Sequence, residues 1–192
     1  HLFHPNSEDT FKLKDVEVEK DSDLVYVGQI VKRKGIEDFI EAINKIKNVM
    51  PGIKAKIIGY GGGNYQTYIE QKITEYKLGD NIKMFGFLPS YEDVLLEVKK
   101  SKIFVLPTYV DSGPRSVAES MTLGVPVISY NIDGLPAMIE NRVSGILVER
   151  GNIDELGKAI LELLNNEQMR KNISENAYKF AQENFYAPTV ID

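Results

Sequence analysis

The run Ile103-Phe104-Val105-Leu106-Pro107 decides the fold class of this sequence, because every residue in it is apolar. A strand with one face in water alternates apolar and polar residues, whereas a strand covered on both faces is apolar throughout. Residues 103–107 are therefore predicted to form a strand inside a sheet that has helices on both faces.

Similar short apolar runs occur on both sides of this one and alternate with helical patterns. The runs lie at residues 24–28 (LVYVG), 55–59 (AKIIG), 82–85 (IKMF), 125–130 (VPVISY) and 145–148 (GILV). Apolar residues at helical spacing follow at residues 36–46, 69–76, 94–98, 117–121, 153–164 and 167–185. This alternation predicts an α/β fold with a Rossmann-like, doubly wound parallel sheet of about six strands.

The composition fits one soluble globular domain. The chain has 192 residues, of which 43% are hydrophobic and 27% are charged, and one domain per about 150 residues is the usual expectation. There is no cysteine, which excludes a disulfide framework, a thiolate metal site and a cysteine nucleophile. The formal net charge of −5 argues against nucleic acid as the main partner. No apolar run reaches the roughly 18 residues of a membrane-spanning helix.

Three segments are expected along the chain. Residues 1–22 are polar and are interpreted as a linker or lead-in segment with room for one edge strand. Residues 23–186 form the predicted domain, and residues 187–192 form a tail. The sequence begins with His1 rather than Met, so we expect a processed product or a piece of a longer protein.

The loop after the first strand combines glycines with cations. Doubly wound sheets bind ligands beyond the carboxyl ends of their strands, and this loop runs from Gly28 through Gln29, Arg33 and Lys34 to Gly35. Glycine lets a ligand approach the backbone, and the N-terminus of the next helix offers free N–H groups to an anion. Arg33 or Lys34 can then pair with a phosphate. The alternative is a solvated basic loop.

Two further loops contain glycines but carry weaker signals. The loop Gly59-Tyr60-Gly61-Gly62-Gly63-Asn64 fails the dinucleotide-binding pattern, because Asn64 stands where the third glycine belongs. We interpret it as a flexible turn that borders a ligand. The apolar turn at residues 85–89 contains Phe87, which is either part of a wall against a planar base or part of a packed loop.

The loop after the fourth strand carries the most chemistry. It reads Asp111-Ser112-Gly113-Pro114-Arg115-Ser116-Val117-Ala118-Glu119. Pro114 suits the first position of a helix, so the N–H groups of Arg115, Ser116 and Val117 should lack intrahelical partners and form an anion site. Asp111 and Glu119 flank this site, and carboxylates suit it if each accepts hydrogen bonds from ligand hydroxyls. A sugar nucleotide offers that combination. The alternative is an acidic helix cap and a surface glutamate.

Taken in order, these loops resemble the donor-binding half of the retaining, nucleotide-sugar-dependent glycosyltransferases of group 1 (family four type). The matching segments are Gly28–Gly35, Ile58–Gly61, Gly86, Leu106–Thr108, Asp111–Glu119, Gly124–Ile128, Gly134 and Gly145. The two acids have the spacing of the family's E-x7-E motif, and the G-x-P-V-I segment follows them. The resemblance implies one half of a GT-B architecture, in which two Rossmann-like domains face each other across a cleft.

The resemblance also implies roles for individual residues. Basic residues would hold the donor diphosphate, the first acid would bind the transferred sugar, and the second acid would bind the ribose. The catalytic residues are then expected to be Lys34, Asp111 and Glu119, and the donor-binding residues Gly28, Gln29, Arg33, Gly59, Phe87, Ser112, Gly113, Pro114, Arg115, Ser116 and Val117. The sequence departs from the family where Gln29 replaces an arginine, Asp111 replaces a glutamate and Gly113 replaces a common aromatic residue.

The expected activity is hexosyl transfer from a nucleoside-diphosphate sugar to an acceptor, with retention of anomeric configuration, in carbohydrate or glycan biosynthesis. No metal, cofactor or nucleic-acid partner is expected. The family's amino-terminal acceptor domain does not fit into 192 residues, so this chain alone is expected to be an incomplete catalytic unit. Its acceptor is a carbohydrate, a lipid-linked molecule or a protein. We expect a cytoplasmic protein, either free or peripheral at the inner face of the membrane through the missing domain.

Two other functions remain open at this point. A non-catalytic nucleotide-sugar-binding module would explain an isolated domain with Asp111 in place of the usual glutamate. A sugar-nucleotide epimerase-like domain is the second alternative, but it needs acid/base residues. The only histidines, His1 and His4, lie in the lead-in segment.

Overall fold

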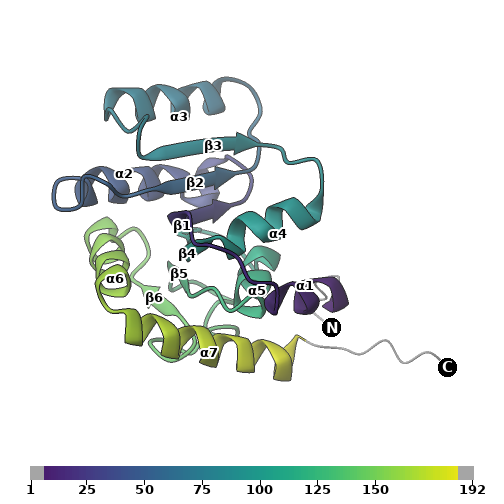
Figure 1. The fold of residues 1–192 in the computed structure, drawn as a ribbon. Helices are drawn as coiled ribbons and strands as arrows, with labels where there is room; N and C mark the ends of the chain where they lie inside the picture. The colour runs from purple at the N-terminus through teal and green to yellow at the C-terminus, as the bar shows by residue number, and fades with distance from the viewer. Residues whose placement is uncertain (1–6, 186–192) are drawn as a thin grey trace.

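The computed structural model describes residues 7–185, and its centre is a six-stranded sheet with helices on both faces (Figure 1). The strands are β1 (Ser22–Val27), β2 (Ala55–Ile58), β3 (Ile82–Gly86), β4 (Ser101–Leu106), β5 (Val127–Tyr130) and β6 (Ile146–Val148). Their order is β3-β2-β1-β4-β5-β6, and each neighbouring pair is parallel. The predicted Rossmann-like, doubly wound sheet is confirmed.

Helices cover the sheet in two layers, which explains why most of the strand residues are apolar. The helices are α1 (Ser7–Lys14), α2 (Ile36–Ile46), α3 (Gly63–Glu75), α4 (Tyr91–Lys99), α5 (Arg115–Thr122), α6 (Ile153–Asn165) and α7 (Glu167–Asn184), with the short 3-10 helix η1 (Lys32–Lys34) before α2. On one side α2 packs against α3 and α6, and on the other α5 packs against α1, α4 and α7. No helix within residues 7–185 has the length and apolar composition needed to cross a bilayer.

The segment before β1 differs from the expectation of at most an edge strand. Ser7–Lys14 form α1, which packs against α4 and α5. Buried Lys99 donates hydrogen bonds from Nζ to the carbonyl oxygens of Leu13 and Lys14 at the end of α1. Only Phe11 and Leu13 of this helix are apolar, so its periodicity was too weak to predict it. The expected tail at residues 187–192, like His1 and His4, lies outside the described residues.

The winding of the sheet reverses between β1 and β4. The chain moves outward from β1 to β2 and β3, and then returns to form β4 on the other side of β1. The helices that follow β1 and β4 therefore leave toward opposite faces, and doubly wound sheets bind ligands beyond the strand ends at such a reversal. The loops that carry Lys34 and Asp111 follow these two strands.

Two glycines allow the loops at this edge to approach each other closely. Gly35 has φ of 69°, and a Cβ there would lie 1.8 Å from the carbonyl oxygen of Pro107. Gly59 has φ of 137°, and a Cβ there would lie 2.0 Å from the carbonyl oxygen of Gly28. Any other residue would collide with backbone and adopt a disfavoured φ. These glycines therefore set the spacing of the loops after β1, β2 and β4.

Candidate functional site

Lys34 and Asp111 lie against each other at the carboxyl edge of the sheet. Lys34 ends η1, after β1, and Asp111 follows β4; the Lys34 ammonium forms an ion pair with the Asp111 carboxylate. Their side chains are only 15% and 13% exposed. The expectation that these two loops share one edge is confirmed, because the carboxyl ends of parallel strands point the same way.

Backbone contacts also fix the two loops to each other. The carbonyl oxygen of Arg33 accepts hydrogen bonds from the Tyr109 N–H at 2.8 Å and from the Thr108 hydroxyl at 3.2 Å. Gly35 lies directly against Pro107 on the same loop. The backbone position of Lys34 is therefore set independently of its ion pair.

A buried acid, Asp38, ties α2 to the same region. Its Oδ2 accepts hydrogen bonds from the hydroxyls of Tyr109 and Tyr130 at 2.6 and 2.5 Å. The two rings meet edge-on, with centroids 5.4 Å apart, and burial together with Asp38 raises the pKa of Tyr109 to about 12. This cluster was not predictable from the sequence, because an acid in the first turn of a helix is ordinary and its partners are 71 and 92 residues away.

Gln29 and Arg33 contact each other at the rim of the loop after β1. Nη2 of Arg33 donates a hydrogen bond to Oε1 of Gln29 at 3.3 Å. Gln29 stands where the resembling family usually has arginine. The Arg33 guanidinium therefore brings a positive charge next to the position from which that arginine is missing.

Glu119 points from α5 into a cluster with two neighbours. Its Oε1 accepts a hydrogen bond from the hydroxyl of Tyr91, at the start of α4, and one from Nε of Arg115 at 2.6 Å. The Glu119 side chain is 7% exposed. This burial raises its pKa, although the hydrogen bonds from Tyr91 and Arg115 act in the opposite direction. The alternative interpretation of Glu119 as a surface residue is therefore wrong.

The N-terminus of α5 offers fewer free donors than predicted. The helix begins at Arg115, and Pro114 is its N-cap rather than its first residue. The Val117 N–H donates to the carbonyl oxygen of Pro114 at 3.0 Å, so the expectation of a free N–H at Val117 is wrong. Within residues 7–185, the N–H groups of Arg115 and Ser116 have no acceptor. The predicted anion site therefore has two free backbone donors instead of three.

The loop after β5 supports the loop that carries Asp111. Gly134 has φ of 91°, and a Cβ there would lie 2.8 Å from the carbonyl oxygen of Ser112. Gly113, the next residue of the supported loop, has φ of 147°, where side chains are disfavoured. The turn at Ser112 and Gly113 thus depends on glycines in both loops.

A hollow of about 490 Å³ lies beyond the ends of β1, β2 and β3. Its lining is mainly apolar and includes Gly28, Gly59, Phe87 and Tyr91. Phe87 is 84% exposed, so the packed-loop alternative is wrong for Phe87, whereas Phe85 and Leu88 of the same turn pack against the core. An open apolar hollow with an aromatic side chain at its rim suits a flat, partly apolar group.

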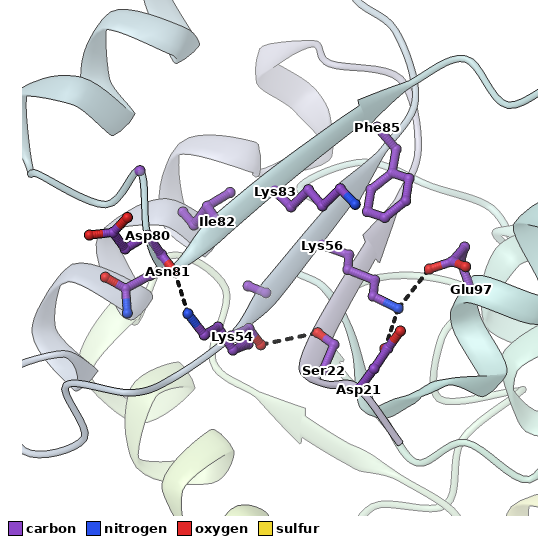
Figure 2. Close-up of a pocket in the computed structure, with 12 residues that line it drawn as sticks. Asp21, Ser22, Lys54, Lys56, Asp80, Asn81, Ile82, Lys83, Phe85 and Glu97 are labelled. Atoms are coloured by element: carbon purple, nitrogen blue, oxygen red, sulfur yellow. Dashed lines mark hydrogen bonds and ion pairs between the residues drawn. The ribbon is translucent and has the colours of Figure 1, made fainter. Parts of the chain in front are cut away.

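A second hollow of about 420 Å³ lies at the opposite edge, where β1, β2 and β3 begin (Figure 2). Figure 2 shows Lys56 of β2 reaching toward Asp21 and Glu97. Its Nζ donates to Oδ1 of Asp21 at 2.5 Å and to Oε2 of Glu97 at 2.6 Å. Glu97 also accepts a hydrogen bond from Lys100 at 2.8 Å. Lys56, Asp21 and Glu97 of this hollow thus pair with one another, and the hollow contains none of the predicted site residues.

At the carboxyl edge the two acids lie apart, and each is ion-paired with one cation. Asp111 pairs with Lys34 and Glu119 pairs with Arg115. In the part of the chain that the structure describes, no three His, Cys, Asp or Glu side chains come together to hold a metal ion. This edge therefore offers cations and N–H groups to an anion, and separate carboxylates to hydroxyl groups.

Comparisons with known proteins point to one family. The sequence profile of the family Glycosyl transferases group 1 matches residues 7–180. An uncharacterised glycosyltransferase of Methanocaldococcus jannaschii is 29% identical over 161 residues, which are 83% of this chain and 43% of that protein. The alpha-D-kanosaminyltransferase of Streptomyces kanamyceticus is 27% identical over 154 residues, 80% of this chain and 39% of that protein.

A solved structure with a similar fold is that of Anabaena HepE in complex with UDP-glucose. Its TM-score is 0.79 at 23% identity, over 86% of this chain and 45% of that one. This likeness shows the fold alone, a Rossmann-like domain. The chain spans less than half the length of the curated relatives that it matches.

Proposed function

The chain belongs to the glycosyl transferases group 1 family, and we propose that it is the donor-binding half of an enzyme that transfers a sugar from a nucleoside-diphosphate sugar. One observation carries this proposal: a single sheet edge brings together Lys34, two free N–H groups and two separate carboxylates beside an apolar hollow. A nucleotide sugar has the complementary groups in order, which are a base, a ribose, a diphosphate and a second hydroxylated ring.

The diphosphate is proposed to replace Asp111 as the partner of the Lys34 ammonium group. A phosphate oxygen accepts charge-assisted hydrogen bonds from an ammonium group, and the N–H groups of Arg115 and Ser116 and the nearby Arg33 add donors. Negative charge develops on the diphosphate as its bond to the anomeric carbon breaks, and these fixed donors stabilise that charge. The proposal therefore needs no metal and no cofactor.

The two acids are proposed to serve the two rings. Asp111, once released by Lys34, accepts hydrogen bonds from hydroxyls of the transferred sugar. Glu119 accepts hydrogen bonds from the ribose, and the base lies in the hollow against Phe87. The glycines Gly28 and Gly59, which line that hollow, let the ligand approach the backbone.

The rest of the enzyme is proposed to lie in an amino-terminal half that binds the acceptor. The support is that this chain covers 43% and 39% of the two relatives described above. The acceptor is proposed to be a carbohydrate, a lipid-linked molecule or a protein, and the anomeric configuration is proposed to be retained. The proposed location remains the cytoplasm, free or peripheral at the inner face of the membrane through the acceptor half.

A second candidate function is a nucleotide-sugar-binding module without turnover. The observation that favours it is that Asp111, one methylene shorter than the family's glutamate, is held by Lys34. Assaying the chain together with an acceptor half separates the two functions. Release of nucleoside diphosphate supports the enzyme, and binding of nucleotide sugar without release supports the module.

The donor-binding proposal is tested by thermal unfolding of the chain with UDP, GDP and ADP. At 100 times its dissociation constant, a ligand that binds only the folded chain should stabilise it by about 2.7 kcal/mol. Stabilisation by one of the three supports the proposal. The absence of any shift with all three would overturn it.

A further inference from the structure

The two oxygens of the Glu119 carboxylate have different surroundings. Oε1 accepts hydrogen bonds from the Tyr91 hydroxyl and from Nε of Arg115. Oε2 has no hydrogen-bond partner among the described residues. Each fully buried side-chain oxygen of these residues has a hydrogen-bond partner. Oε2 therefore reaches the surface, and it is the oxygen that Glu119 can offer to a ligand.

Tyr91, Arg115 and Glu119 form one unit across two helices. The Arg115 guanidinium lies over the Tyr91 ring, 4.8 Å from its centroid, and pairs with Glu119 one turn further along α5. A guanidinium that stacks on an aromatic ring and also bonds a carboxylate is held in one orientation. The Arg115 side chain is therefore directed at Glu119 and not at the N-terminus of α5.

Tyr91 connects this unit to the hollow at the carboxyl edge. It is one of the residues that line the hollow, it is 38% exposed, and its hydroxyl bonds Glu119. Glu119 itself does not line the hollow. In a ligand whose base fills the hollow, the base therefore lies near the ring of Tyr91 and the ribose lies toward Glu119.

We propose that Tyr91 is a positioning residue that makes the site select ribose over deoxyribose. The inference rests on the proposed function, in which Glu119 binds the ribose. With Oε1 occupied, one fixed oxygen is left to accept a ribose hydroxyl. A deoxyribose that lacks this hydroxyl leaves that oxygen unpaired once the ligand excludes water, which should weaken binding about tenfold or more.

The hydroxyl of Tyr91 matters because the last torsion of a glutamate side chain turns easily. Two hydrogen bonds on Oε1 oppose that rotation. Without the Tyr91 hydroxyl, the carboxylate can turn and present either oxygen to water or to the ligand. The missing hydroxyl of a deoxyribose then costs less, so selectivity falls.

The test compares the wild-type chain with Tyr91→Phe by calorimetric titration. UDP, GDP and ADP are titrated first, and then the 2′-deoxy and 3′-deoxy forms of whichever binds tightest. The wild type is expected to prefer the ribose form over at least one deoxy form by about tenfold or more, and Tyr91→Phe to reduce that ratio to less than about threefold.

Tyr76→Phe is the matched control. Its hydroxyl donates to Glu41 at 2.6 Å, at a tyrosine–glutamate pair outside the site, so this variant should keep the wild-type ratio. Thermal melts confirm that both variants are folded.

Two results separate failure of this inference from failure of the proposed function. A folded Tyr91→Phe that keeps the wild-type ratio, or a wild type without any preference for ribose, overturns the role of Tyr91 alone. Failure of all three diphosphates to bind the wild type overturns both.

Discussion

The ammonium group of Lys34 is ion-paired with the carboxylate of Asp111, 77 residues further along the chain. The proposed phosphate-binding cation and the proposed sugar-binding acid therefore neutralise each other before any ligand binds. Both side chains are largely buried, where an unpaired charge would be costly. The ion pair leaves neither charge unpaired. Binding of a diphosphate is then an exchange, in which one anion replaces another at Lys34 and Asp111 becomes free.

Replacing Lys34 with alanine is expected to weaken nucleoside-diphosphate binding by about 1–3 kcal/mol, the scale of a lost charge-assisted hydrogen bond. Calorimetric titration measures the change. Lys45→Ala is the control, because Lys45 also pairs with an aspartate, Asp154, at 2.7 Å, but on an exposed surface. If Lys34→Ala and Lys45→Ala bind the nucleoside diphosphate with equal affinity, the loop after β1 is not part of the site.

Asp111→Asn is expected to affect the affinity for the nucleotide sugar differently from the affinity for the bare nucleoside diphosphate. This variant loses the anion that competes for Lys34, so affinity for the bare nucleoside diphosphate should stay unchanged or rise. Affinity for the nucleotide sugar should fall relative to the bare diphosphate, because an amide accepts fewer hydrogen bonds from hydroxyls than a carboxylate does. Titrating both ligands checks this, and a loss of equal size for both contradicts the role assigned to Asp111.

Glu119→Gln is expected to weaken ligand binding without lowering stability. Burial raises the pKa of Glu119. A raised carboxyl pKa stabilises the folded chain below the unfolded-state pKa, and this contribution is lost as the pH rises through the folded-state pKa. At neutral pH the ionised group is thus a net cost to folding, so the variant should melt at the same temperature or higher. A clearly lower melting temperature contradicts this.

The same pKa shift predicts how binding depends on pH. Nucleotide affinity of the wild type should fall as the pH is lowered through the raised pKa of Glu119, because the protonated group accepts hydroxyl hydrogen bonds poorly. Ligand phosphates titrate as well, so Glu119→Gln serves as the reference in the same buffers. The affinity of the wild type divided by that of Glu119→Gln should decrease toward low pH. A ratio that stays constant would show that Glu119 is not part of the site.

Phe87→Ala is expected to affect binding and not stability. The side chain is 84% exposed, so its removal exposes no core, whereas loss of a base-stacking aromatic typically costs about 1–3 kcal/mol. Val49, which is 70% exposed elsewhere, provides the control variant Val49→Ala. Melting curves and nucleotide titrations of both variants check this, and unchanged affinity in Phe87→Ala would move the base out of the hollow.

The sheet could be predicted from the sequence because strands covered on both faces contain apolar runs, such as residues 103–106 of β4. That Lys34 and Asp111 lie at the same edge followed from that prediction, because both lie in loops after parallel strands. α1 could not be predicted, because its contacts with α4 and α5 are tertiary and its own sequence is mostly polar. The hydrogen bonds of Asp38 to Tyr109 and Tyr130 also depend on distant parts of the chain.

The contacts within the site differ in how far the sequence indicates them. Arg115 and Glu119 are four residues apart, a spacing at which side chains meet on a helix, so their pairing was predictable. The contact of Tyr91 with Glu119 was not, because it joins two helices. The loss of the free N–H at Val117 depends on the backbone path at Pro114, and the presence of a proline does not specify that path.

The most direct test of the central claim is a crystal structure of the chain with the nucleoside-diphosphate sugar that stabilises it most. The account predicts that the diphosphate lies within hydrogen-bond distance of Nζ of Lys34, that Asp111 has separated from Lys34, and that the ribose contacts Glu119. A ligand bound instead in the hollow of Lys56 at the amino-terminal edge, or a bound diphosphate with the Lys34–Asp111 pair intact, would contradict it.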